Sequence, residues 1–256
     1  MSTLAPSTGT SLTDALERTR HTRTLVEELI SHPEQLGPDF TPIRRIDEVD
    51  AVLTRAPLLG WKATGRGRAG TPVGDTLALL DEARRLGLVE RLDWSFRCHA
   101  FDLATQAGLQ GELHLTPEPE TFGAPCPPRL AVSFLRGRRA LAVCAELHED
   151  SFVDERRLRV AVDQMREWGW QFVYADLAGT SAERSALELM ESIRPAYVQV
   201  NLASAYRSAA LVQGASRIGA TLLGVGVDSA AALAQARDLG IRWARGALLG
   251  QSVSSL

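Results

Sequence analysis

Hydrophobic and polar positions in the second half of the chain change their period repeatedly. Stretches in which apolar residues recur every three or four positions are typical of helices, and the short apolar runs between them are typical of strands. From Asp154 onward the pattern predicts this order: helix to 168, strand 172–176, helix 182–193, strand 197–201, helix 205–218, strand 221–225, helix 230–239 and strand 242–245. Glycines such as Gly169 and Gly219 follow the helices, as expected for C-terminal caps. The alternation predicts a parallel sheet with right-handed crossovers.

The first half of the chain has a less regular pattern. Residues 1–11 are rich in Ser, Thr, Pro and Gly, which predicts a flexible tail, and residues 12–37 predict an N-terminal helix with a linker. The unit 38–254 begins with two predicted strands, 40–46 and 58–64, joined by a turn, and a third strand follows at 113–115. Helices are predicted at 73–86 and 93–107, and loops at 65–74 and 117–128. Residues 129–147 are apolar, but the pattern does not divide them. About seven or eight strands in one chain favour a closed barrel over an open sheet.

In a barrel of alternating strands and helices, the chemistry lies at the C-terminal ends of the strands. The residues expected there are the following: 62–66, His114, Glu146, Asp176, Asn201, Val225 and Arg245. Lys62 stands out because it is the single lysine of the chain. A lysine at a barrel strand end can form a Schiff base, but the neighbouring base and the phosphate-binding loop expected beside such a lysine are not evident.

Composition narrows the class of protein. Of the 256 residues, 45% are hydrophobic and 23% are charged, as in an ordinary soluble globular protein. The net charge of -3 gives no electrostatic footprint for DNA or for an anionic membrane. The apolar runs are too short to span a bilayer and the first residues lack a signal-peptide pattern, so we expect a cytoplasmic location. Cys98, Cys126 and Cys144 are widely spaced, which suggests neither a disulfide framework nor a zinc site and predicts buried small apolar side chains.

Short segments spread in a consistent order from about Leu12 to Gly250 carry a further signal. They are the following: Phe40-Thr-Pro-Ile43, Gly60-Trp-Lys-Ala-Thr-Gly-Arg66, Leu86-Gly-Leu-Val89, Leu113-His-Leu-Thr-Pro117, Glu146-Leu-His-Glu149, Ala175-Asp-Leu177, Tyr197-Val-Gln-Val-Asn201 and Gly226-Val-Asp228. Together they resemble the EAL domain, the cyclic di-GMP phosphodiesterase family. The resemblance implies an α/β fold, an EAL-like modified TIM (β/α)8 barrel with an N-terminal helix. In active members it also implies hydrolysis of a phosphodiester with two divalent cations and an activated water.

The chain departs from the motifs of that family at the strand ends. Where the resemblance implies metal-binding or catalytic residues, the chain has these instead: Lys62 for the motif glutamate, His114 for an asparagine, Ala175 and Asn201 for aspartates, Gln199 for a lysine, Val225 for a glutamate and Arg245 for a glutamine. Glu146 and Asp176 are the expected acidic ligands that remain. Two carboxylates beside an ammonium and a guanidinium hold two divalent cations poorly. We therefore expect a catalytically inactive barrel without a cofactor, in which Lys62 and Asp176 form an ion pair.

The candidate ligand-binding residues are Lys62, Arg66, Asp176 and Arg245. Arg66 aligns with the substrate-contacting arginine of the family, and a guanidinium suits a phosphate. The alternative is a solvated loop arginine. His114, Glu146 and Asp176 form a candidate site for one residual metal ion, with a hydrogen-bonded core histidine as the alternative.

These observations lead to three hypotheses for the function. The first is an inactive regulatory barrel that binds a protein partner, and the second is a receptor for cyclic di-GMP or another nucleotide. The third is residual cyclic di-GMP phosphodiesterase activity with Mg or Mn. EAL-like barrels commonly pair with each other, so we also expect a homodimer, although the loop 177–181 departs from the family's pattern.

Overall fold

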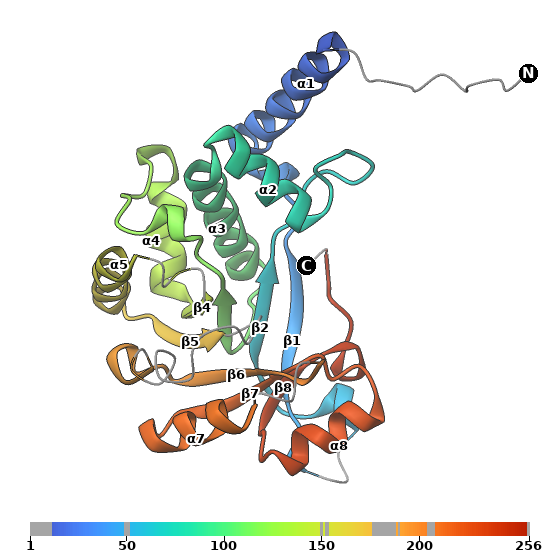
Figure 1. The fold of residues 1–256 in the computed structure, drawn as a ribbon, viewed down its shortest axis with the longest axis vertical. Coiled ribbons are helices and arrows are strands. Elements are labelled where there is room, and N and C mark those ends of the chain that lie inside the picture. The colour runs from blue at the N-terminus through green and yellow to red at the C-terminus, as the bar shows by residue number, and fades with distance from the viewer. Residues whose placement is uncertain are drawn as a thin grey trace, which may run out of the picture.

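Eight strands close into a barrel in which the strands follow one another in chain order and β8 returns to β1 (Figure 1). This computed structural model describes residues 12–48, 52–148, 151, 154–175, 188, 190–203 and 208–254. The strands are β1 (Asp39–Arg45), β2 (Leu58–Thr64), β3 (Glu112–Leu115), β4 (Ala142–His148), β5 (Gln171–Ala175), β6 (Tyr197–Asn201), β7 (Thr221–Val225) and β8 (Trp243–Arg245). The closed barrel confirms the architecture that the sequence predicts.

β1 differs from the other strands in its direction. It runs antiparallel to β2 and to β8, whereas every pairing from β2 to β8 is parallel. The connection 46–57 holds one 3-10 turn, Leu53–Arg55, in its described part. A parallel crossover usually needs an α-helix, so this short link returns the chain in the opposite direction. The predicted parallel order therefore applies to the seven strands from β2 to β8, and β1 is antiparallel to both of its neighbours.

The helices surround the barrel on the outside. They are α1 (Leu12–Ser31), α2 (Thr76–Leu86), α3 (Val89–Gln106), α4 (Ala131–Ala140), α5 (Glu155–Glu167), α7 (Ser208–Ile218) and α8 (Ala230–Asp238). α2 begins later than predicted because the Asp75 side chain accepts hydrogen bonds from the N–H groups of Leu77 and Ala78 and so caps the helix. α3 begins at Val89, earlier than predicted, and the undivided stretch 129–147 contains α4 and β4.

Two sequence predictions concern parts of the chain that lie mainly outside the described residues. The predicted tail 1–11 falls there entirely. Of the predicted helix 182–193, positions 188 and 190–193 are described, and they are helical.

Aromatic side chains fill the layer between the barrel and the helices α3, α4 and α5. The rings of Trp94 and Phe134 meet edge to face with their centres 5.4 Å apart, and the centres of Trp168 and Trp170 lie 5.0 Å apart. These side chains belong to or pack against the largest cluster of buried residues. Such packing is expected where outward-facing strand residues meet amphipathic helices.

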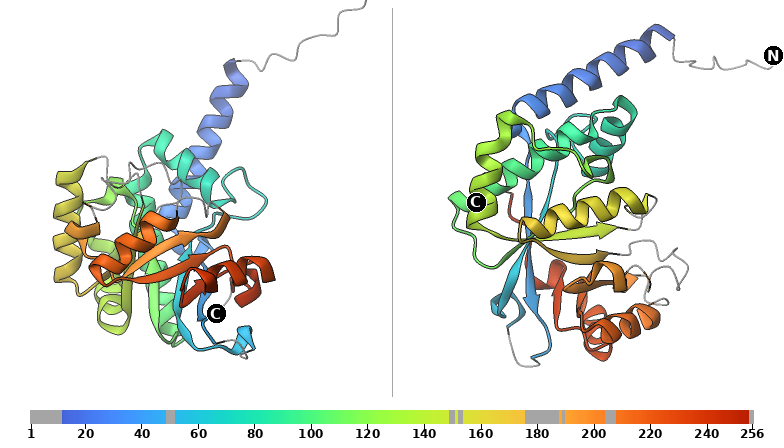
Figure 2. Two further views of the ribbon diagram at one scale, coloured as in Figure 1. Left: turned by 60° about the horizontal axis from the view of Figure 1, so that its bottom comes forward. Right: turned by 90° about the vertical axis from the view of Figure 1, so that its left-hand side faces the viewer.

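α1 projects from the barrel, and its C-terminal end packs against the body of the protein (Figure 2). The buried residues Val26, Leu29 and Ile30 join a cluster with residues of α2 and α3. At the other end of the chain, Val253 pairs with Phe40 of β1. Within the described ranges, no helix has the length and apolar character needed to cross a membrane.

Candidate functional site

Five polar side chains from five strands meet inside the barrel, toward the C-terminal ends of the parallel strands. They are Lys62 on β2, His114 on β3, Glu146 on β4, Gln199 on β6 and Arg245 on β8. All of them except the half-buried Arg245 are buried. Successive residues of a strand face opposite sides of the sheet, and each of these residues occupies an inward position. We call them the mouth cluster.

Glu146 is the centre of the mouth cluster. Lys62 Nζ lies 2.7 Å from Glu146 Oε2. Arg245 contacts both carboxylate oxygens, with Nη1 2.5 Å from Oε1 and Nη2 3.2 Å from Oε2. His114 Nδ1 lies 3.4 Å from Glu146 Oε1, and Arg245 Nη2 also donates to Gln199 Oε1 at 3.0 Å. Two cationic groups thus face one carboxylate, which leaves an excess of positive charge at this level of the barrel.

The charges of the mouth cluster shift the pKa values of its members. Burial by itself would raise the pKa of the Glu146 carboxyl, but the attraction of Arg245 and Lys62 outweighs it and holds that pKa well below its usual range. Glu146 is therefore ionised at neutral pH. Burial lowers the pKa of the Lys62 ammonium, and the attraction of Glu146 opposes this shift.

The mouth cluster does not fit the pair of divalent cations that the resemblance implies. Mg²⁺ and Mn²⁺ prefer oxygen ligands, especially carboxylates and waters. The single carboxylate of the cluster, Glu146, is already bound by Lys62 and Arg245. Asp176, the other acidic residue expected here, lies outside the described residues. Among the described residues Lys62 pairs with Glu146, and the predicted pair of Lys62 with Asp176 lies outside them.

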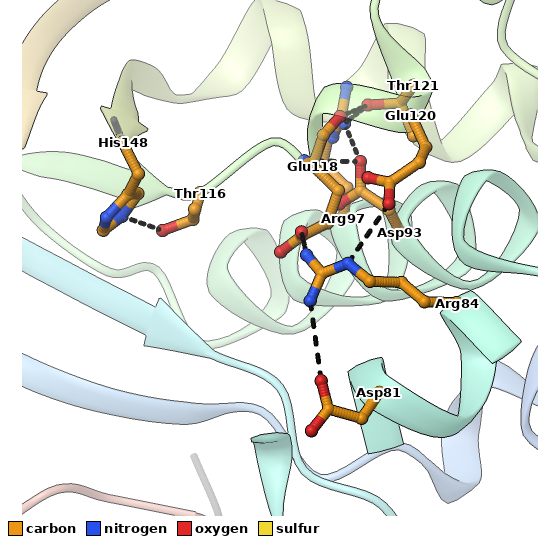
Figure 3. A network of polar contacts seen from close by, with 9 residues as sticks. All are labelled: Asp81, Arg84, Asp93, Arg97, Thr116, Glu118, Glu120, Thr121 and His148. Carbon is orange, nitrogen blue, oxygen red and sulfur yellow. Dashed lines mark hydrogen bonds and ion pairs between the residues drawn. The ribbon is translucent and has the colours of Figure 1, made fainter. Parts of the chain in front are cut away.

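A pocket of about 600 Å³ opens beside Lys62, between β2, α2, α3 and the segment that follows β3. Its walls are mainly apolar and include the following residues: Leu36, Leu79, Leu80, Leu92 and Phe96. Lys62 Nζ also donates to Thr116 Oγ1. Thr116 Oγ1 in turn lies 3.4 Å from His148 Nε2 (Figure 3). The pocket therefore combines an apolar wall with a polar end at Lys62.

Ion pairs border the same pocket (Figure 3). Arg84 of α2 pairs with Glu118 at 2.5 Å and with Glu120 at 3.1 Å. Arg97 and Asp93 of α3 form a buried ion pair, and Asp93 Oδ2 also accepts from the Glu118 N–H at 3.4 Å. These contacts fix the segment after β3 against α2 and α3.

Arg66 lies apart from the mouth cluster. Its Nη2 is 2.6 Å from Asp39 Oδ1 and 2.9 Å from Ser254 Oγ, and 46% of its side chain is exposed. Its backbone N–H and C=O pair with those of Gly37. In this structure Arg66 joins the loop after β2 to β1 and to the C-terminal segment.

Two other strand ends considered from the sequence have separate roles. Asn201 Oδ1 accepts a hydrogen bond from the backbone N–H of Ala203 at 3.1 Å. Val225 is the last residue of β7 and pairs with Arg245 of β8 in the sheet.

Gln199 is not among the binding residues predicted from the sequence, and neither are the deeper residues Glu112, Cys144 and Tyr197. Below the mouth cluster, Tyr197 OH donates to Glu112 Oε1 at 3.0 Å, close to His114 and Cys144. The polar residues at every second position of the apolar segment 197–201 could have revealed these interior positions, because inward-facing residues recur with a period of two.

Neither a family model nor a curated protein matches the chain. Solved structures of EAL proteins do match its fold. The EAL domain of Xanthomonas citri FimX in complex with c-diGMP has a TM-score of 0.74 at 14% identity, covering 94% of this chain and 96% of that chain. A standalone EAL protein from Vibrio cholerae O395 in its c-di-GMP-bound form has a TM-score of 0.63 at 17% identity, covering 86% and 94%.

A third match is Klebsiella pneumoniae BlrP1 in a complex with manganese and cyclic di-GMP, with a TM-score of 0.65 at 18% identity. It covers 85% of this chain, and this chain spans 56% of BlrP1. At identities this low, the likeness shows the fold alone. It confirms the EAL-like barrel that the sequence motifs predict.

Proposed function

We propose that this chain binds a nucleotide at the mouth of its barrel without hydrolysing it, and acts through binding. The observation that carries the proposal is the occupation of Glu146 by both Lys62 and Arg245. The same contacts argue against metal-assisted hydrolysis and in favour of an anionic ligand.

The charges of the mouth cluster disfavour hydrolysis. Two divalent cations stabilise the attacking and leaving oxygens of a phosphodiester only when anionic ligands hold them close together. In the mouth cluster, the groups facing Glu146 are an ammonium, a guanidinium and an imidazole. A metal ion would have to displace the buried Lys62 and the half-buried Arg245 from their carboxylate, which is unfavourable because each would lose its partner.

The charge of the mouth cluster and the shape of the neighbouring pocket both favour a nucleotide. Phosphates are bound in proteins by lysine and arginine, and the mouth cluster has both in excess of its carboxylate. Beside Lys62, the pocket offers apolar walls that include Phe96, against which a flat base can pack. The three solved EAL proteins described above were determined with cyclic di-GMP, which makes it the first ligand to test.

The test is a calorimetric and thermal-shift titration of the full chain with cyclic di-GMP, with and without Mg²⁺ or Mn²⁺. We expect saturable binding that does not require a metal ion, a raised melting temperature, and no linear dinucleotide product. Lys62→Met should weaken binding at least tenfold, as removal of one charged contact does. Arg136→Ala removes an exposed cation on α4 and is the matched control with unchanged affinity.

Two results would overturn the proposal. Metal-dependent formation of a linear dinucleotide would show residual phosphodiesterase activity. If neither cyclic di-GMP nor any of a panel of other nucleotides binds, the proposal of a nucleotide ligand is wrong. The hypothesis of an inactive regulatory barrel that binds a protein partner would then remain. That alternative would then be pursued by cross-linking and pull-down, with a sedimentation measurement to test for the homodimer.

A further inference from the structure

Three side chains that commonly bind metal ions lie together in the barrel interior, where His114 of the mouth cluster meets two neighbouring residues. They are Glu112 and His114 of β3 and Cys144 of β4, each offering one ligand atom, and these atoms all lie within 4.8 Å of one another. We propose that Glu112, His114 and Cys144 bind a Zn²⁺-type ion. This site shares His114 with the mouth cluster, but the observations that support it do not depend on nucleotide binding.

The backbone places the three side chains on one inner surface. Glu112 and His114 are two residues apart on one strand, so they face the same side of the sheet. His114 and Cys144 are paired neighbours on adjacent parallel strands. Because the strands fix these positions, side-chain rotation is enough to close the group around an ion.

The donor set selects the class of metal ion. Carboxylate, imidazole and thiolate are the ligands of Zn²⁺ sites, with bonds of about 2.0 to 2.3 Å. A thiolate disfavours Mg²⁺ and Mn²⁺. On the side of Cys144 the surroundings are apolar, with Val173, Leu223 and Ile43 fully buried in the same cluster, whereas His114 also faces the charged Glu146. Such surroundings disfavour a hydrated ion and favour one that is bound directly by protein side chains.

The surroundings of His114 provide a second, independent observation. Its Nε2 lies 3.1 Å from Glu112 Oε2, and its Nδ1 lies 3.4 Å from Glu146 Oε1. Histidines that bind metal ions usually donate their second ring N–H to a carboxylate, which fixes the ring and its tautomer. Glu146 is well placed for this role because Lys62 and Arg245 hold it in position.

Glu112 is oriented in the same way. Tyr197 OH donates to Glu112 Oε1 at 3.0 Å, which leaves Oε2 directed at His114. The side chain of Glu112 is 20% exposed, whereas that of His114 is fully buried. Entry of an ion is therefore expected from the N-terminal end of the barrel, where β3 begins with Glu112.

Binding of the ion also has a defined proton balance. The Cys144 thiol loses its proton to solvent as the sulfur becomes a thiolate ligand, and His114 binds through a neutral ring nitrogen. No oxidation or reduction is involved. The ion joins β3 to β4, so we expect it to stabilise the fold.

The test uses the tag-free, metal-free full chain titrated with Co²⁺ and then with Zn²⁺. We expect one Co²⁺ per chain, a thiolate-to-cobalt absorption band that Zn²⁺ abolishes, and a higher melting temperature with Zn²⁺. Cys144→Ala should lose the band, whereas Cys98→Ala, a buried cysteine in α3, should keep it. Glu112→Gln should keep the band and weaken Co²⁺ binding at least tenfold.

Several outcomes would contradict the site. They are the absence of a thiolate band in the native chain, a band that survives Cys144→Ala, and unchanged Co²⁺ affinity in Glu112→Gln. If Cys144→Ala does not fold, the Glu112→Gln titration decides alone. Nucleotide binding plays no part in these measurements, so failure of the metal site and failure of the proposed function can be told apart.

Discussion

Lys62 on β2 and Glu146 on β4 form a buried ion pair, with Nζ 2.7 Å from Oε2, although β3 lies between their strands in the barrel. His114 on β3 contacts the same carboxylate, with Nδ1 3.4 Å from Glu146 Oε1. Because Arg245 reaches the same carboxylate from β8, Glu146 connects β2, β3, β4 and β8 through their side chains. Because three side chains share the one carboxylate of Glu146, loss of Glu146 should affect stability more than loss of any one of its partners.

Glu146→Gln should be strongly destabilising. It leaves Lys62 and Arg245 buried or half-buried without their counter-charge, and breaking a buried pair in this way costs about 3 to 5 kcal/mol. Urea denaturation followed by circular dichroism measures the effect. The control is Glu155→Gln, an exposed residue paired with Arg159 on α5, for which we expect a change below about 1 kcal/mol. Equal effects of the two substitutions would contradict the central role of Glu146.

Lys62→Met should cost less than Glu146→Gln, about 1 to 3 kcal/mol. The reason is that Glu146 keeps Arg245 and His114 as partners when Lys62 is removed. A double-mutant cycle with both substitutions should show that their effects are not additive, since the residues are in contact. An unchanged melting temperature for Lys62→Met would show that the ion pair contributes nothing to stability.

The buried pair of Arg97 and Asp93 should give the protein a characteristic pH dependence. Burial raises the pKa of the Asp93 carboxyl in spite of the attraction of Arg97. A carboxyl whose pKa is higher in the folded state stabilises most when it is protonated, and this contribution is lost as the pH rises through the folded pKa. Arg97→Met removes the positive charge that opposes the rise of the Asp93 pKa. The free energy of unfolding of this variant should therefore fall as the pH rises from about 4 to 7.

The double variant Asp93→Asn with Arg97→Met is the control for this pH dependence. The other groups that contact Asp93, the Thr121 side chain and the Glu118 N–H, do not titrate. We therefore expect the double variant to lose the extra slope in urea denaturation measured across that pH range. A slope that persists would assign the effect to another residue.

Gly137→Ala should destabilise the contact between α4 and α3. A Cβ at Gly137 would lie 2.5 Å from Phe101 Cβ, which is too close for two carbon atoms. We expect a cost of about 1 to 3 kcal/mol from overpacking, even though alanine favours helix by about 1 kcal/mol over glycine. In the control, Gly37→Ala, no atom lies within 4 Å of the added Cβ. A melting temperature of Gly137→Ala equal to that of the control would contradict the close packing.

Arg66→Ala tests whether Arg66 contributes to ligand binding. Its pair with Asp39 is partly exposed, so we expect a loss of stability below about 1 kcal/mol. If Arg66 binds a phosphate, as the resemblance implies, the affinity for cyclic di-GMP should fall at least tenfold while the melting temperature of the free protein hardly changes. Unchanged affinity in calorimetry would identify Arg66 as a loop arginine that joins β1 to the C-terminal segment.

Local sequence pattern by itself determined most of the elements. The strands 197–201 and 221–225 have the predicted boundaries. A short apolar run that lies between helical segments and next to a glycine cap is compatible with few structures other than a buried strand. The start of α2 was less well predicted, since the Asp75 cap excludes the residues before it from the helix. Lys62, Glu146 and Arg245 were recognised as strand-end residues from the order of the motifs.

Only the tertiary structure decided which of these residues meet. The sequence did not indicate that Lys62 and Arg245 both contact the carboxylate of Glu146. Likewise, the wide spacing of the cysteines hid the approach of Cys144 to Glu112 and His114. The alternation along a strand fixes which side chains face inward, but barrel closure and the stagger between strands decide which inward residues come together. That information belongs to the packing of the strands and not to the local pattern of any one of them.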